Sequence, residues 1–150
     1  MGPLYGMLEQ ELRGLREWLD QQVAAGKIDE SSSCAGAPVL LLRKPNDSFR
    51  LCVDYLALNK VTVKNRYPLP LMTELKERLN KVKVFTKLDL KNGYHLVRMA
   101  EEDEEKTVFW TRFRLYHWWV IPFGLCIAPA MFQSMMDNIL HDLLNNGVIV

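Results

Sequence analysis

The sequence predicts a single mixed α/β (α+β) domain, because strand-type and helix-type patterns share a chain of 150 residues. An apolar fraction of 49% and a charged fraction of 25% are typical of a globular protein with a hydrophobic core. Short runs of alternating apolar and polar residues lie between segments with apolar residues at helical spacing. No apolar run approaches the roughly 18 residues of a spanning helix. The start, MGPLYGMLEQ, lacks the basic and apolar regions of a signal peptide.

The cysteines and histidines give no sign of a disulfide framework or a metal cluster. Cys34, Cys52 and Cys126 lie far apart, with no C-x-x-C motif, and the three histidines are scattered. This usage fits a reducing compartment. We therefore expect an intracellular protein, in the cytoplasm or nucleus, with no membrane partner.

The N-terminal third predicts a helix and then a hairpin. Leucines at 8, 12, 15 and 19 recur at helical spacing and predict an amphipathic helix that ends near Gly26. The polar segment 29–36 (DESSSCAG) is expected to be a loop. The apolar runs 37–42 and 49–53 flank turn residues at 45–47 and predict a β-hairpin. Period two places Phe49, Leu51 and Val53 on one face, and Arg50, Cys52 and Asp54 on the other.

The middle of the chain predicts an extended segment, a short helix and a strand. Prolines in NRYPLPL (65–71) favour extended backbone. Apolar residues at 72, 75 and 79 then suggest a short helix. Alternation across 82–90 predicts a strand that carries Asp89 near its end, before an Asn92-Gly93 turn.

The last third predicts two strands and the clearest helix. We expect strands within 106–111 (KTVFWT) and 113–120 (FRLYHWWV), and a solvated acidic turn at 101–105. Pro129 suits the first turn of a helix that runs to the stop signal at 145–147. The final GVIV (147–150) is expected to be a strand, and its unpaired edge is a candidate for self-association.

The nearly neutral net charge of +1 conceals a basic middle. Residues 37–98 carry 13 basic and 5 acidic side chains, whereas the segments on either side are net acidic. Such a segment is a candidate surface for phosphates, whose counterions it would release. The alternative is a solvated surface that happens to be basic, and composition alone favours that alternative.

Asp89 lies between Leu88 and Leu90 in FTKLDLKNGYH. A buried carboxylate is costly unless it is paired or bound to a metal ion. An exposed or capping aspartate before the Asn92-Gly93 turn explains the pattern equally well. The residues alone leave this choice open.

Three blocks together resemble the reverse transcriptase of a gypsy-type LTR retrotransposon. They are RLCVDYLALNKVTVKNRYPLPL, FTKLDLKNGYH and IPFGLCIAPAMFQ, in the order and spacing of that family, and the resemblance extends from about Leu15 to Val150. It implies the fingers and the first part of the palm of a right-hand polymerase, truncated before the Tyr-x-Asp-Asp hairpin. The expected parts of this partial domain (1–150) are an N-terminal helix (1–30), a fingers hairpin with an extended segment (37–70), and fingers and palm (71–150).

The resemblance also implies roles for particular residues. Asp89 matches the first catalytic aspartate and, with the backbone carbonyl of Leu90, a Mg²⁺ contact. Tyr94 matches the aromatic residue under the sugar of the incoming nucleotide. Arg50 matches the fingers arginine on the triphosphate, with further positive charge from Arg43 and Lys44. The remaining nucleotide-binding positions are Phe123, Gly124 and Gln133.

The sequence also departs from the family pattern. Leu56, Ile127 and Arg114 stand where Arg, Asn and Gly are usual, and no Tyr-x-Asp-Asp motif is present. The resemblance implies template-primer and deoxynucleoside triphosphates as partners and Mg²⁺ as cofactor, but a two-metal site needs more than one carboxylate. We therefore expect a fragment of an RNA-directed DNA polymerase that is inactive alone. The alternatives are a non-catalytic binding module for nucleic acid or protein, and a decayed remnant.

Overall fold

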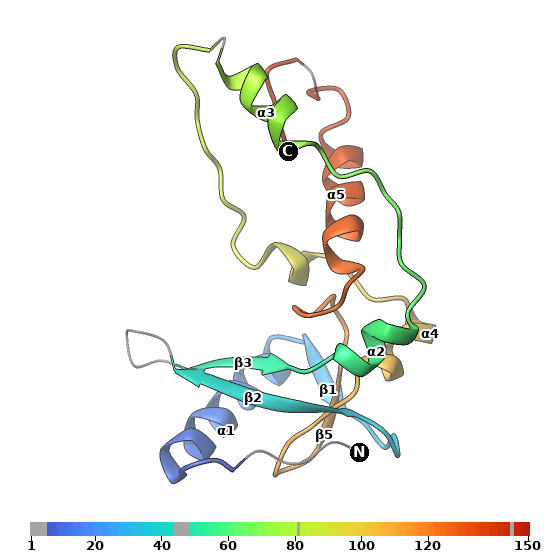
Figure 1. Cartoon of the computed structure of the whole chain (residues 1–150). Helices are drawn as coiled ribbons and strands as arrows, with labels where there is room; N and C mark the ends of the chain where they lie inside the picture. Colours follow the sequence, from blue (N-terminus) through green and yellow to red (C-terminus); the bar gives the residue numbers. More distant parts are fainter. Residues whose placement is uncertain (1–5, 44–48, 81, 145) are drawn as a thin grey trace.

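The computed structural model describes residues 6–43, 49–80, 82–144 and 146–150. A five-stranded sheet forms one end of the molecule, and an arm that contains α3 and α5 extends away from it (Figure 1). The expected α/β class is confirmed. The elements in chain order are α1 (Glu9–Ala24), β1 (Ile28–Glu30), β2 (Ala37–Arg43), β3 (Phe49–Val53), α2 (Leu56–Val61), α3 (Met72–Leu79), η1 (Gly93–Leu96), α4 (Glu101–Glu104), η2 (Glu105–Thr107), β4 (Phe109–Trp110), β5 (Leu115–Trp118) and α5 (Ala128–Ile139).

The strand order is β1-β5-β4-β2-β3, with β2 and β4 parallel and the other pairs antiparallel. Helix α1 packs on this sheet, as its leucine spacing predicts. Leu15 and Leu19 are fully buried against Phe109 and Trp118, because the helical period brings them to one face. The helix ends at Ala24, before Gly26 with its positive φ of 63°.

The predicted hairpin is present as β2 and β3. Val39 lies opposite Val53 and Leu41 opposite Leu51. Leu51 and Val53 pack against the core while Arg50 is exposed, so the predicted two faces are confirmed for these residues. The expected turn at 45–47, residue Lys44, and the side chains of Arg43 and Phe49 lie outside the described residues.

The sequence predicts a loop at 29–36, but in the structure the loop begins only after Glu30. Residues 28–30 form β1 instead, and Ile28 lies opposite Trp118 on β5. The expectation was wrong because a three-residue strand has too little alternation to identify it. The exposed edge of β5 gives this segment a hydrogen-bonding partner that lies far away in the sequence.

The sequence predicts a solvated turn for the acidic segment 101–105, and this prediction is wrong. The segment forms α4 and the start of η2, and the Glu104 side chain is buried against Arg98. The two strands expected after it are confirmed, although β4 and β5 are shorter than the segments 106–111 and 113–120.

The predicted strand at 82–90 does not form. The backbone is irregular there, and Val84 and Leu88 are 83% and 85% exposed. Between described residues, no backbone hydrogen bond involves residues 83–91. The alternation is present in the sequence, but a strand needs a neighbour to bond with, and no described segment pairs with this one. The prediction that Asp89 ends a central strand is therefore wrong for this structure.

The extended segment 65–71 and helix α3 agree with the prediction. Helix α5 has Pro129 in its first turn, as expected, but ends at Ile139 and continues as hydrogen-bonded turns to Leu144.

Residues 147–150 form no strand, because Val148 makes only a single bridge, with Leu144. The proposed sheet edge at GVIV is therefore absent. None of the helices in the described ranges is long and apolar enough to cross a membrane.

Candidate functional site

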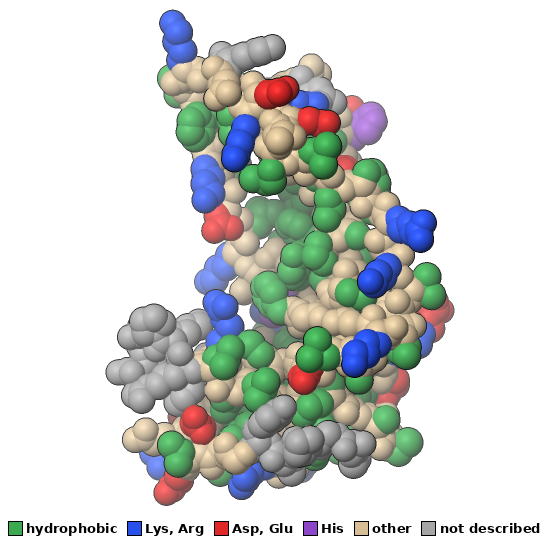
Figure 2. All heavy atoms as spheres, in the orientation of Figure 1, with side chains coloured by type: hydrophobic (Ala, Val, Ile, Leu, Met, Phe, Trp, Pro, Cys, Tyr) green, Lys and Arg blue, Asp and Glu red, His purple; other side chains and the backbone are tan. Residues whose placement is uncertain are grey.

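A large open groove of about 2290 Å³ lies in the arm, between α3, the 82–90 segment, α5 and the last residues of the chain. Apolar side chains fill its wall, and Figure 2 shows them as a green hollow between blue lysine and arginine side chains. Several of these apolar groups are exposed, including Leu88, Phe123 and Ile139. The groove therefore combines an uncovered apolar wall with positively charged surroundings.

Asp89 and Leu90 line this groove. The sequence left open whether Asp89 is buried or exposed. Its side chain is exposed in the structure, so it is a solvated carboxylate. The chain then turns at Asn92, a non-glycine residue in the left-handed region with φ 56°. The Asn92-Gly93 turn that the sequence predicted is confirmed, and it carries the chain from Asp89 to Tyr94.

Tyr94 lies at the centre of an aromatic cluster that joins three separate segments. Its ring centroid is 5.0 Å from that of Phe123 and 5.4 Å from that of Phe132 on α5. Both distances are typical of favourable aromatic pairs. A Cβ added at Gly93 would lie 3.0 Å from the Phe132 ring, so the glycine allows this close approach. Tyr94, Phe123 and Asp89 all line the groove.

Gly124 does not line the groove, but its backbone is constrained. Its φ is +102°, and an added Cβ would lie 3.3 Å from the carbonyl oxygen of Val53. Glycine suits this position because L side chains rarely adopt such a conformation. The neighbouring Phe123 side chain is 59% exposed, and it projects from this turn toward Tyr94.

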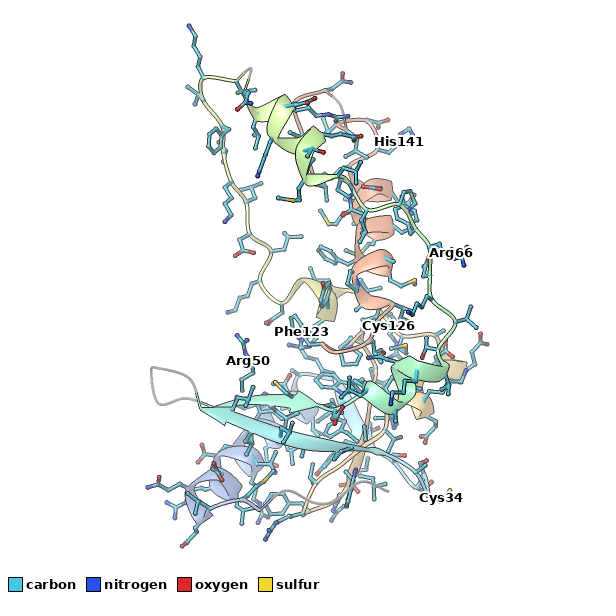
Figure 3. All side chains as sticks on the ribbon, in the orientation of Figure 1. Cys34, Arg50, Arg66, Phe123, Cys126 and His141 are labelled. Atoms are coloured by element: carbon cyan, nitrogen blue, oxygen red, sulfur yellow. The ribbon has the colours of Figure 1, made fainter. Side chains whose placement is uncertain are left out.

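Arg50 is exposed on β3, on the side of the hairpin from which the arm extends (Figure 3). Period-two alternation explains this orientation, since Leu51 and Val53 occupy the core face. Arg50 is not one of the residues that line the groove. Arg43 contributes its backbone to β2, and Lys44 lies outside the described residues.

Gln133 lies on α5 and takes part in a polar network away from the groove. Its Nε2 donates to Asp137 at 2.9 Å, and the Tyr67 hydroxyl donates to the other carboxylate oxygen at 2.7 Å. The hydrogen bond to Asp137 is the main reason why the pKa of Tyr67 is raised. In this arrangement Gln133 helps to tie the extended segment 65–71 to α5.

The sequence did not single out His95, which lies beside Tyr94. Its ring centroid is 5.2 Å from that of Trp118 and 5.6 Å from that of Phe123. Burial, with a smaller contribution from the positive charge of Lys27, lowers the pKa of His95 to about 4. The ring is therefore neutral near pH 7. No spacing in the sequence indicates this, because Lys27 is 68 positions away.

The described residues offer only part of a Mg²⁺ site. Asp89 supplies one carboxylate and Leu90 a backbone carbonyl, both chemically suitable for this hard cation. Across 6–43, 49–80, 82–144 and 146–150, no group of three or more His, Cys, Asp or Glu side chains could hold a metal ion. The donor set of the described chain therefore does not by itself fit a two-ion centre.

Cations from the basic middle are exposed on the hairpin, on α2 and the extended segment after it, on the arm, and at Arg98. The described ones are Arg50, Lys60, Lys64, Arg66, Lys76, Arg78, Lys83, Lys87, Lys91 and Arg98. Figure 2 shows lysine and arginine side chains on both sides of the apolar hollow. This distribution suits contacts with a polyanion.

The chain matches the family model for reverse transcriptase (RNA-dependent DNA polymerase) over residues 42–150. It is 48% identical over 103 residues to an RNA-directed DNA polymerase homolog of Oenothera berteroana, covering 69% of this chain and 72% of that protein. It is 40% identical over 141 residues to the retrovirus-related Pol polyprotein from transposon 297 of Drosophila melanogaster, covering 91% of this chain but 13% of that protein. It is 34% identical to the transposon Tf2-7 polyprotein of Schizosaccharomyces pombe, and it spans 11% of that length.

Among solved structures, the fold is similar to that of the foamy viral protease-reverse transcriptase in complex with an RNA/DNA hybrid. The TM-score is 0.80 at 19% identity, and the match covers 99% of this chain and 20% of that one. A second structure of that protein, with double-stranded DNA and designated dRH, gives a TM-score of 0.75 at 19% identity, covering 95% of this chain and 24% of that one. These likenesses concern the fold alone.

Proposed function

We propose that this chain, which belongs to the reverse transcriptase family, is the fingers and first palm portion of an RNA-directed DNA polymerase. In a longer retroelement polyprotein it would add deoxynucleotides to a primer by two-metal phosphoryl transfer. The subtype suggested by the sequence blocks is the gypsy type of LTR retrotransposon. The chain spans a small part of the transposon polyproteins it matches, which is consistent with this role.

One observation carries the proposal. Asp89, Leu90, Tyr94 and Phe123 come from two segments about thirty positions apart, and all four line one groove. The Tyr94–Phe123 ring distance of 5.0 Å adds direct contact between the two segments. These are residues to which the family resemblance gives metal-binding and nucleotide-binding roles.

In this proposal Asp89 and the carbonyl of Leu90 contribute ligands to Mg²⁺, which would neutralise the charge of the triphosphate when bound. Tyr94 and Phe123 contact the sugar and base of the incoming nucleotide. Arg50, with Arg43 and Lys44 of the hairpin, contacts the triphosphate, since guanidinium groups suit phosphate oxygens. Gly124 and Gln133 do not line the groove and would act indirectly. Gly124 shapes the turn that carries Phe123, and Gln133 helps to tie α5 to segment 65–71 through Asp137.

The isolated chain should bind template-primer weakly and fail to extend it. Weak binding follows from the exposed cations of the hairpin, of α2 with the extended segment after it, and of the arm. Failure to extend follows from the donor set, because Asp89 is the one carboxylate in a block that the family uses for catalysis, and no Tyr-x-Asp-Asp motif is present.

The test is a fluorescence-anisotropy titration of a labelled primed template at several salt concentrations. We expect binding that weakens with salt, and replacement of Arg43, Lys44 and Arg50 by Ala should flatten the log–log salt slope by about 0.7 to 0.9 per lost contact. Arg13→Ala, an exposed charge on α1, is the matched control and should leave the slope unchanged.

An unchanged slope in the triple variant would show that the hairpin is not the binding surface. Primer extension by the chain alone, abolished by Asp89→Asn, would contradict its proposed inactivity. Absence of binding in the unaltered chain would favour a decayed remnant.

A further inference from the structure

We infer that Asn59 is a positioning residue that fixes the loop carrying Phe123 and Gly124. This inference rests on the proposed function, because the loop borders the groove in which a nucleotide would bind. Nothing in the spacing of the sequence assigns a role to Asn59. Its role follows from two contacts that the fold creates.

Asn59 lies on α2 and binds the loop through both groups of its amide. Its Nδ2 donates to the carbonyl oxygen of Gly124 at 2.7 Å, and its Oδ1 accepts the backbone N–H of Cys126 at 2.8 Å. Both lengths are those of good hydrogen bonds. A carboxamide carries a donor and an acceptor on one plane, which a carboxylate or an aliphatic side chain cannot reproduce.

The backbone of Asn59 is anchored to the buried residue Tyr55. The Asn59 backbone N–H donates to the carbonyl oxygen of Tyr55 at 2.7 Å, and Tyr55 is 2% exposed. The Tyr55 hydroxyl in turn donates to the carbonyl oxygen of Thr107 at 2.7 Å. Asn59 therefore connects the loop to a residue of the hydrophobic core.

The hydrogen bonds from Asn59 matter for Phe123 because its side chain is exposed. Ile121 and Leu125 are buried and hold the loop at both ends, whereas the Phe123 side chain is 59% exposed. Since burial does little to fix Phe123, the backbone position of the following residues determines where its ring meets Tyr94, at 5.0 Å. Removing the Asn59 amide should free the loop while leaving the core intact.

The experiment compares Asn59→Ala and Asn59→Asp with the control Asn65→Ala in the full chain. Asn65 lies on the neighbouring extended segment, where its side chain contacts Met131 and the Tyr67 backbone and not the loop. Amide hydrogen exchange at Cys126 should accelerate by about fivefold or more in Asn59→Ala, the factor expected for one lost hydrogen bond. Asn59→Asp should retain much of the Cys126 protection, because a carboxylate still accepts that N–H.

A second readout reports on the site. The nuclear Overhauser contacts between the Tyr94 and Phe123 rings should weaken in Asn59→Ala and persist in the control. In a chemical-shift titration with thymidine triphosphate and Mg²⁺, affinity should fall by about fivefold in Asn59→Ala and remain unchanged in Asn65→Ala.

The outcomes separate the two proposals. If the unaltered chain binds the nucleotide and Asn59→Ala binds it equally well, the inference is overturned and the proposed function stands. If the unaltered chain binds no nucleotide, the proposed nucleotide site fails in this chain, and the exchange rate and ring contacts alone decide the role of Asn59. Unchanged exchange at Cys126 with unchanged ring contacts overturns the inference in either case.

Discussion

The Nζ of Lys27 lies 3.5 Å from Nδ1 of His95, across 68 positions of the sequence. Lysine has no acceptor, so the imidazole accepts at Nδ1 and carries its proton on Nε2. The contact links the turn after α1 to the segment that presents Tyr94. It requires a neutral histidine, because a protonated ring would face a positive charge at close range.

The first prediction concerns this pair and pH. The folded chain holds the pKa of His95 at about 4, below the ordinary histidine value of 6.5, so the unfolded chain binds this proton more readily. The stability that the folded chain owes to a neutral His95 is therefore present above pH 6.5 and is lost as pH falls toward 4. His95→Gln, neutral throughout, should lose less thermal stability than the unaltered chain between pH 7 and pH 4.5. Equal losses in both proteins would contradict the assignment.

The second prediction concerns the buried carboxylate of Glu104. Its Oε1 lies 2.8 Å from Nη2 of Arg98, whose guanidinium also lies 4.2 Å from the Trp119 ring centroid. Arg98→Ala would leave the buried carboxylate without its guanidinium partner, with Nε2 of His117 at 3.9 Å as its remaining neighbour among the described ion pairs. We expect a loss of about 2 kcal/mol in the free energy of unfolding, reduced by the solvent exposure of Arg98.

Urea denaturation measures this loss. Glu104→Gln added to Arg98→Ala should restore part of it by removing the unpaired charge. Arg13→Ala, which breaks an exposed pair with Glu9, should change stability by less than about 0.5 kcal/mol. A comparable effect from both arginines would argue against a buried ion pair.

The third prediction concerns the close approach of Gly93 to α5. An added Cβ would lie 3.0 Å from two ring atoms of Phe132. Gly93→Ala should therefore displace that ring, lower the free energy of unfolding by about 1 kcal/mol, and disturb the Tyr94–Phe132 contact. A Cβ added at Gly6 meets no described atom within 4 Å, so Gly6→Ala serves as the control in the same denaturation experiment. An unchanged free energy of unfolding in Gly93→Ala would mean that the Phe132 ring moves aside at no cost.

The fourth prediction concerns self-association. The sequence predicts an unpaired edge at 147–150, whereas the structure exposes the apolar side chains of 82–90, and between described residues no backbone hydrogen bond involves 83–90. We expect concentration-dependent association through this segment, reduced by the double variant Val84→Lys/Leu88→Lys. Val63→Lys, at a position 91% exposed on the extended segment after α2, is the control. A monomer at all concentrations in light scattering would refute this expectation.

Much of the local structure could be predicted because it depends on neighbouring residues. Leu15 and Leu19 are at helical spacing in any context, and turn residues between two alternating runs specify a hairpin. The Asn92-Gly93 turn and Pro129 in the first turn of α5 follow from the backbone preferences of single residues. For the same reason, the predicted outward direction of Arg50 agrees with the structure.

The remaining features depend on contacts between distant segments, which no local pattern contains. Ile28 becomes part of a strand because β5 offers an edge, and the 82–90 segment does not become one because no described segment pairs with it. Glu104 is buried because Arg98 lies beside it. The sequence by itself determined the periodicities, the basic middle and the blocks that carry the family resemblance. Only the tertiary structure decided which of these residues share a groove, because hydrogen bonds and charge pairs form between groups that folding brings together.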